Sequence, residues 1–172
     1  MQQRTIILDG FSKYFAMTGW RLGYAIVNED LAHYFGRWAT NTISCTSTFI
    51  QMAGLAGMKK DKSPSEAMVD EFERRRDLIY KRLNEINGIS TLKPKGAFYI
   101  FANVTEACKN LGLKDSLEFQ DYLLEKADVA TLSRVFFGHK SPNEKDEYLR
   151  FSFCVSYDDI VEGMDRIEKL LS

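Results

Sequence analysis

Apolar residues recur along this chain in two patterns, one typical of strands and one typical of amphipathic helices. Short apolar runs at residues 5–8 and 22–27 predict buried strands bounded by turn residues. Residues 97–104 and 147–155 alternate apolar and polar side chains at period two, which predicts two half-buried strands. The pattern therefore indicates strands in both halves of the chain.

Helix signals separate these strands. The clearest start is Ser63-Pro64-Ser65-Glu66, a capping hydroxyl before Pro with Glu three residues after the cap, and an apolar stripe follows until Asn87-Gly88. Asn28 predicts the cap of another helix, and residues 115–126 and 156–171 predict capped amphipathic helices. The small residues Ala53, Gly54, Ala56 and Gly57 predict a close approach by another backbone.

These elements predict an α/β chain of two domains. Strand, loop, strand and helix occupy residues 1–62, and an α+β layer occupies residues 63–172. The boundary is expected within residues 59–63, before the long helix. Exposed strand edges in residues 4–27 would favour pairing with another copy of the chain.

Composition narrows the class of protein. The 172 residues are 45% hydrophobic, and 23 basic residues against 24 acidic ones give a net charge of -1, so we expect a small substrate, no nucleic acid and no membrane. No apolar run reaches transmembrane length, and we expect a cytoplasmic location. The three cysteines lack CxxC spacing and are expected to be buried thiols, and neither His33 nor His139 has metal-ligand spacing, so no metal is expected.

The most informative segment runs from Gly10 to Gly23, Gly-Phe-Ser-Lys-Tyr-Phe-Ala-Met-Thr-Gly-Trp-Arg-Leu-Gly. Lys13 follows a small residue, Ser12, and precedes a Gly-x-Arg-apolar-Gly sequence that contains Arg21. A lysine amine is a poor nucleophile at its reference pKa of about 10.4, so Schiff-base chemistry requires desolvation or a nearby cation. Arg21, eight residues further on, is the candidate for that cation.

A second segment with chemical potential lies near the carboxyl end, at Tyr-Leu-Arg-Phe-Ser-Phe, residues 148–153. Strand alternation places Leu149 and Phe151 on one face and Arg150 with Ser152 on the other. Arg on the less apolar face of a strand is usually solvated, but its planar fork also suits a carboxylate.

Together these motifs resemble the class I and II pyridoxal-phosphate-dependent aminotransferases, of fold type I and similar to aspartate aminotransferase. The resemblance implies that Lys13 forms a Schiff base with pyridoxal 5'-phosphate and moves the substrate's α-proton. It also implies that Ser12 and Arg21 hold the cofactor phosphate and that Arg150 receives the α-carboxylate of the substrate. Residues 1–62 then correspond to the carboxyl-terminal part of the cofactor-binding large domain, and residues 63–172 to the small domain.

The resemblance covers nearly the whole chain but only the later part of the family's sequence. It implies transfer of an amino group between an amino acid and a 2-oxo acid by a homodimer, with this chain alone expected to lack full activity. Carbon-sulfur lyases and cyclopropane-forming synthases share the attachment motif and stay open as alternatives, as does a noncatalytic folded or dimerising unit.

Two further segments bear on the substrate side. Residues 94–99, Pro-Lys-Gly-Ala-Phe-Tyr, resemble the family's segment that enters the small domain's sheet, and a turn followed by a strand suffices to explain them. Residues 133–138, Ser-Arg-Val-Phe-Phe-Gly, depart from the family's Pro-Gly-x-x-Phe-Gly and precede a longer polar loop that reaches Glu147. The motif match to the family is therefore closer for cofactor attachment than for the substrate side.

Overall fold

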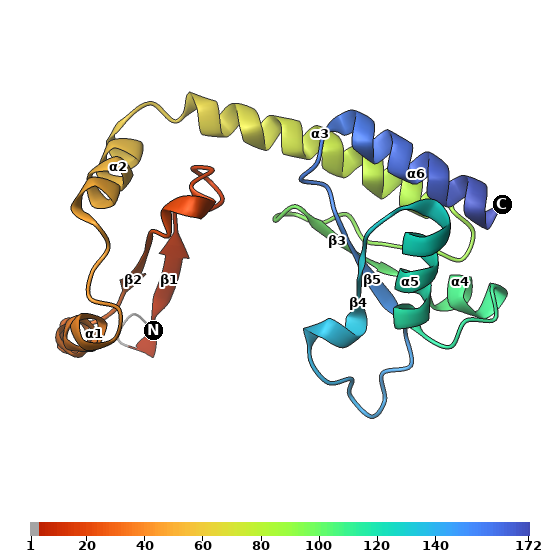
Figure 1. Cartoon of the computed structure of the whole chain (residues 1–172), viewed down its shortest axis with the longest axis horizontal. Helices are drawn as coiled ribbons and strands as arrows, with labels where there is room; N and C mark the ends of the chain where they lie inside the picture. Colours follow the sequence, from red (N-terminus) through yellow and green to blue (C-terminus); the bar gives the residue numbers. More distant parts are fainter. Residues whose placement is uncertain (1–3) are drawn as a thin grey trace. The chain divides into compact units, whose positions relative to one another are not determined.

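The computed structural model describes residues 4–172, and it divides into two compact units, Met1–Met68 and Val69–Ser172. The first unit contains the hairpin of β1 (Ile7–Gly10) and β2 (Gly23–Ile26), followed by α1 (Glu29–Thr42) and α2 (Thr48–Lys59) (Figure 1). The two strands are antiparallel, with Ile7 opposite Ile26 and Gly10 opposite Gly23. The domain boundary expected within residues 59–63 stays a prediction.

Both strands form where the apolar runs predict them, but their predicted burial is wrong within the described chain. Ile7 is 51% exposed, Leu8 is 77% exposed and Ile26 is 55% exposed. A sheet of two strands is too small to bury its own side chains, so burial would require further strands or a covering layer.

Local capping chemistry sets where the helices begin. The Asn28 side chain accepts a hydrogen bond from the Leu31 N–H at 2.9 Å, which confirms the predicted cap of α1. The long helix α3 (Ser63–Glu85) begins at the predicted segment, but the Ser63 hydroxyl is not its cap, because it donates to Asp61 at 2.5 Å. Asp61 also accepts from the Ser63 N–H at 3.0 Å, so the carboxylate takes over a role that we assigned to the hydroxyl.

The second unit is built on a three-stranded antiparallel sheet of order β3-β5-β4. Its strands are β3 (Tyr99–Asn103), β4 (Leu132–Ser133) and β5 (Tyr148–Ser152). The other elements are α4 (Thr105–Asn110), α5 (Ser116–Ala127), the 3-10 helix η3 (Arg134–Phe137) and α6 (Tyr157–Leu171) (Figure 1). Asp115 caps α5 and Ser156 caps α6 with a complete capping box, as the sequence predicts.

One face of this sheet forms the core. Ile100 and Ala102 of β3 and Leu149 of β5 are at most 1% exposed, and they pack in one cluster with apolar residues of α3, α5 and α6. Alternation sends the intervening residues of each strand to the opposite face. The predicted orientation of Leu149 and Phe151 toward the core is thus confirmed, and Arg150 is left on the other face.

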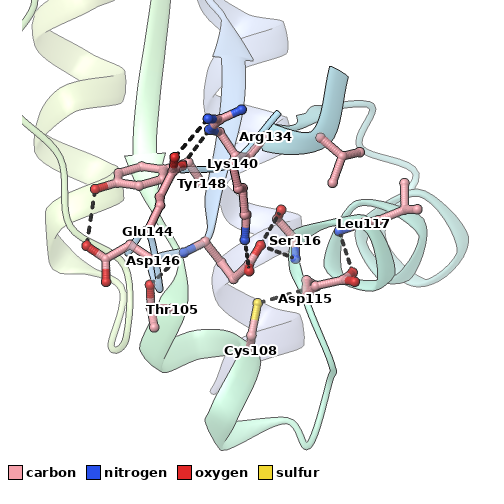
Figure 2. Close-up of polar contacts among 12 residues, drawn as sticks. Thr105, Cys108, Asp115, Ser116, Leu117, Arg134, Lys140, Glu144, Asp146 and Tyr148 are labelled. Atoms are coloured by element: carbon pink, nitrogen blue, oxygen red, sulfur yellow. Dashed lines mark hydrogen bonds and ion pairs between the residues drawn. The ribbon is translucent and has the colours of Figure 1, made fainter. Parts of the chain in front are cut away.

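A buried polar network joins the ends of several elements (Figure 2). The Glu147 carboxylate accepts hydrogen bonds from the N–H of Ser116 at 2.9 Å and from its hydroxyl at 2.7 Å, and it forms an ion pair with Lys140. The Glu147 N–H donates to the Thr105 hydroxyl at 2.9 Å, and the Ser116 and Ser133 hydroxyls share a hydrogen bond of 2.9 Å. Glu147 therefore ties the polar loop that precedes β5 to α4 and α5.

The three cysteines do not share one environment. Cys108 is buried, and Cys45 and Cys154 are exposed, so the prediction of three buried thiols is wrong for two of them within this chain. All three are free thiols. Among the described residues, none of the helices combines the length and the apolar character needed to cross a membrane.

Candidate functional site

The predicted attachment segment folds into a tight turn between β1 and β2. The Phe11 N–H donates to the Leu22 carbonyl at 3.1 Å, which closes the turn at the end of the hairpin. Inside it, the Ala16 N–H donates to the Lys13 carbonyl at 3.1 Å. Ala16 and Arg21 adopt left-handed backbone conformations, with φ of 52° and 54°. Two such residues that are not Gly in one turn indicate local strain, which is concentrated at functional sites in proteins.

This turn brings together the three residues assigned to the cofactor. Ser12, Lys13 and Arg21 line one pocket of about 550 Å³. The side chain of Arg21 donates from Nη1 to the Thr18 carbonyl at 3.0 Å, so the guanidinium is anchored to the same turn. The pocket therefore contains an amine, a guanidinium and a hydroxyl, all from one segment of 10 residues between Ser12 and Arg21.

One acid, which no sequence motif indicated, lies in the same pocket. Asp9 of β1 accepts a hydrogen bond from the Gly10 N–H at 2.7 Å and one from the Tyr24 hydroxyl at 3.0 Å. The hydrogen bond to Asp9, followed by burial and by the carboxylate's charge, raises the pKa of Tyr24. Asp9 faces Tyr24 across the hairpin, so the strand register was the signal that would have linked them.

Helix α2 packs against apolar side chains of the turn. A Cβ added to Gly54 would meet Leu22 Cδ2 at 2.4 Å and Phe11 Cζ at 3.3 Å, and one added to Gly57 would lie 3.3 Å from the Phe15 ring. The neighbours of these two glycines are close, as predicted, but they are side chains, so the predicted approach of another backbone is wrong for Gly54 and Gly57. Phe11 is only 6% exposed and stacks on Phe15 at 5.1 Å, which gives the turn a small apolar base.

Arg150 lies in the second unit, on the face of β5 opposite the core. Its direct neighbour across the sheet is Phe101 of β3. The Arg150 guanidinium carbon lies 4.2 Å from the centroid of the Tyr99 ring and 4.9 Å from that of the Phe137 ring. Within residues 4–172, this guanidinium has no hydrogen bond and no ion pair. Its N–H groups are available to an anion.

The other arginines of the second unit behave differently. Six of the seven have a carboxylate within ion-pair distance, namely Arg74, Arg75, Arg76, Arg82, Arg134 and Arg166. Arg150 is the seventh, and among the described residues it contacts aromatic rings instead of an acid. A half-buried guanidinium without a carboxylate partner is a good candidate for binding the carboxylate of a ligand.

The structure thus brings Ser12, Lys13 and Arg21 into one pocket and places Arg150 on the sheet of the other unit. Sequence reasoning missed the aromatic partners of Arg150. The pattern of residues 94–99 predicted only a turn followed by a strand, and it gave no role to Tyr99. A cross-strand pairing of residues 101 and 150 would have put Tyr99 two positions along β3 from the residue that faces Arg150.

Known proteins resemble this chain along almost its whole length. An aromatic-amino-acid aminotransferase of Thermococcus litoralis is 41% identical over 99% of the chain, and an aspartate aminotransferase of Pyrococcus abyssi is 40% identical over 99% of it. The crystal structure of an aromatic aminotransferase from Pyrococcus horikoshii matches with a TM-score of 0.89 and 38% identity, covering 99% of this chain and 44% of that one.

The chain spans 42% of the length of each of the two curated relatives. The sequence model of the family described as aminotransferase class I and II matches residues 1–167. Because the family model matches almost the whole chain and the relatives are this similar, the chain belongs to the class I and II aminotransferases.

Proposed function

We propose that this chain serves the pyridoxal-phosphate-dependent transfer of an amino group between an amino acid and a 2-oxo acid. The observation that carries the proposal is the single pocket in which Ser12, Lys13 and Arg21 meet. The names of its relatives, aspartate and aromatic aminotransferases, support the reaction class. Because the chain spans less than half of those relatives, the activity is proposed for the whole protein.

The groups in the pocket fit the two reactive ends of pyridoxal 5'-phosphate. An amine is the nucleophile that an aldehyde requires, and a guanidinium with a hydroxyl provides donors for phosphate oxygens. When bound, the cofactor supplies an electron sink for the substrate's α-carbon. The Arg21 fork and the Ser12 hydroxyl are proposed to bind the phosphate, and their short distance in sequence from Lys13 keeps the aldehyde end near its amine.

Lys13 has two tasks in this proposal. Its Nζ would hold the aldehyde end of the cofactor, and its amine would take the proton from the substrate's α-carbon. Arg21 lines the same pocket as Lys13. Arg150 is proposed to bind the substrate's α-carboxylate, supported by the lack of any acid partner for it among residues 4–172.

Covalent capture tests the role of Lys13. The full chain is mixed with pyridoxal 5'-phosphate, reduced with borohydride, digested, and analysed by mass spectrometry for the modified lysine. We expect an absorbance band in the near-ultraviolet or violet and a reduced adduct at Lys13. The Lys13→Ala variant should lose this band, whereas Lys59→Ala, which removes a lysine at the end of α2, should keep it. An unchanged band in the Lys13→Ala variant would overturn the assignment.

The phosphate site is tested with two aldehydes that differ only in the phosphate. Pyridoxal 5'-phosphate should be captured by the wild-type chain at lower concentration than pyridoxal. Arg21→Ala should reduce this difference by about 10-fold, because one bidentate phosphate contact is lost. Arg37→Ala, which removes an exposed guanidinium from α1, should leave the difference unchanged. Equal loss in both variants would mean that only general positive charge is involved.

Two broader proposals accompany this function. Three free cysteines without any disulfide fit a reducing, cytoplasmic compartment. Large apolar side chains of the first unit are exposed, among them Trp38 at 75%, Ile43 at 78% and Phe49 at 69%, and they support association into a homodimer. Gel filtration at high concentration checks this association, and a strict monomer would count against it.

A further inference from the structure

The starting observation is the contact of Arg150 with two aromatic rings. Arg150 faces Phe101 across the sheet, and Tyr99 lies two residues before Phe101 on the same face of β3. The second ring, Phe137, comes from the last residue of η3, far from β3 in sequence. Centroid distances of 4.2 Å and 4.9 Å lie within the range of cation–π attraction.

The position of Phe137 is itself held by polar contacts at both ends of η3. Arg134 forms a bidentate ion pair with Glu144, with Nε–Oε1 at 2.6 Å and Nη2–Oε2 at 2.9 Å (Figure 2). The same guanidinium donates from Nη1 to the carbonyl of Gly138, the residue after Phe137, at 2.9 Å. The side chains of Arg134 and Glu144 are only 13% and 23% exposed, so solvent screens this pair weakly. The contacts of Arg134 therefore hold the chain on both sides of Phe137, at residue 134 and at Gly138.

The surrounding rings leave Phe137 little freedom. Its ring meets Phe101 edge-on at 5.6 Å, and Phe101 stacks on Tyr148 at 5.2 Å and an interplanar angle of 4°. Arg150 thus lies in an aromatic surface drawn from β3, β5 and η3. A guanidinium has many rotamers, and contacts with ring faces reduce them without using its N–H donors. Contacts of this kind orient a cation and leave its hydrogen-bonding edge available.

We propose that Tyr99 and Phe137 are positioning residues for Arg150, and that the Arg134–Glu144 ion pair holds Phe137 in contact with it. The rings fix the guanidinium so that its N–H groups meet the substrate's carboxylate in one orientation. This inference rests on the proposed carboxylate role of Arg150. It assigns the aromatic residues an effect on orientation and leaves the charge of the site unchanged.

The test uses the side-chain N–H signals of arginine in the ¹⁵N-labelled full chain, with the Arg150 signal assigned by its loss in Arg150→Lys. Ring faces shift the resonances of protons above them, so the Arg150 Nε–H signal should differ from those of exposed arginines. Pyruvate, a small 2-oxo acid, is then titrated while this signal is followed. Sodium chloride at the same ionic strength serves as the control for nonspecific charge effects.

We expect Phe137→Leu and Tyr99→Leu to move the Arg150 signal toward the exposed arginines and to weaken pyruvate binding by about 3- to 10-fold each. Leucine keeps apolar volume and removes the ring. Tyr99→Phe keeps the ring and should retain the wild-type signal and affinity. Glu144→Gln should move the signal in the same direction as Phe137→Leu, by a smaller amount.

Phe136→Leu is the matched control. Phe136 is the neighbour of Phe137 in η3, it is 59% exposed, and it makes no ring contact with the described part of the chain. This variant should leave both the Arg150 signal and the affinity for pyruvate unchanged. Circular dichroism of each variant checks that the helices and the sheet persist.

The two proposals fail in different ways. If pyruvate leaves the Arg150 signal of the wild-type chain unmoved, the carboxylate role is wrong, and the positioning role is lost with it. If pyruvate moves that signal but Phe137→Leu and Tyr99→Leu bind it as tightly as the wild type, only the positioning role is wrong. Equal weakening by Phe136→Leu and Phe137→Leu would also overturn it.

Discussion

Replacing Glu147 by Gln tests how the polar loop before β5 is fastened to the second unit. Glu147 accepts two hydrogen bonds from Ser116 and forms an ion pair with Lys140, and its side chain is only 13% exposed. Gln has nearly the same shape, but it has one acceptor oxygen and no charge. Both Ser116 hydrogen bonds end at the same carboxylate oxygen, Oε2, so the single Gln oxygen can accept both, but as a neutral acceptor, and the Gln amide group then faces Lys140.

The expected cost follows from the loss of the negative charge. A hydrogen bond to a charged group contributes about 1.5–3 kcal/mol and one between neutral groups about 0.5–1.5 kcal/mol, so two such bonds together lose about 2 kcal/mol. Lys140 is 29% exposed and can turn to solvent, and a Gln amide costs less to bury than a carboxylate, so neither effect adds to this total. We therefore expect Glu147→Gln to destabilise the second unit by about 2 kcal/mol, which raises the equilibrium constant for local opening about 30-fold.

Amide hydrogen exchange of the full chain measures this opening. Peptides from β5 and α5 should exchange faster in Glu147→Gln. The fluorescence of Trp20 and Trp38, the two tryptophans of the chain and both in the first unit, should not change. Glu106→Gln is the control, because the Glu106–Lys109 pair is 65% and 66% exposed and solvated ion pairs contribute little. Equal exchange in the two variants would refute the reasoning.

The effect of Glu147 should depend on pH in a defined direction. Burial raises the pKa of Glu147, but hydrogen bonds from Lys140 and Ser116 lower it more, so the folded value lies below 4.5. A lowered pKa means that stabilisation is present above the unfolded value and is lost as the pH falls through the folded value. Urea unfolding followed by circular dichroism should therefore show the gap between wild type and Glu147→Gln narrowing from about pH 7 to about pH 3.

Three further outcomes are expected. Burial, together with the nearby charge of Glu147, raises the pKa of Cys108 to about 11. A thiol reagent such as DTNB should therefore titrate only the other two cysteines in the native chain at about pH 8. Rapid reaction of all three would contradict this. Gly54→Val should push against Leu22, alter tryptophan fluorescence and weaken capture of pyridoxal 5'-phosphate, whereas Gly36→Ala, which meets nothing within 4 Å, should do neither. Ser156→Ala removes the cap of α6 and should cost about 1 kcal/mol, seen as faster exchange in its first turn; unchanged exchange there would show that the cap contributes little.

Much of the secondary structure could be predicted from the sequence, because the signals involved act over a few residues. The caps at Asn28, Asp115 and Ser156 and the period-two runs around β3 and β5 all correspond to elements of the structure. The motif around Lys13 is equally local. A turn of about 10 residues brings Lys13 and Arg21 to one pocket, and α2 packs against the apolar side chains of that turn.

The sequence by itself thus determined the family and most of the elements, and it supplied the candidate residues for the chemistry. Only the tertiary structure decided what surrounds them: the absence of any acid partner for Arg150 within residues 4–172, its contact with Tyr99 and Phe137, and the burial of Glu147 against Ser116. These contacts join residues 13 to 51 positions apart. Periodicity and capping reflect the geometry of neighbouring residues, whereas such contacts depend on strand register and on the path of the chain between elements.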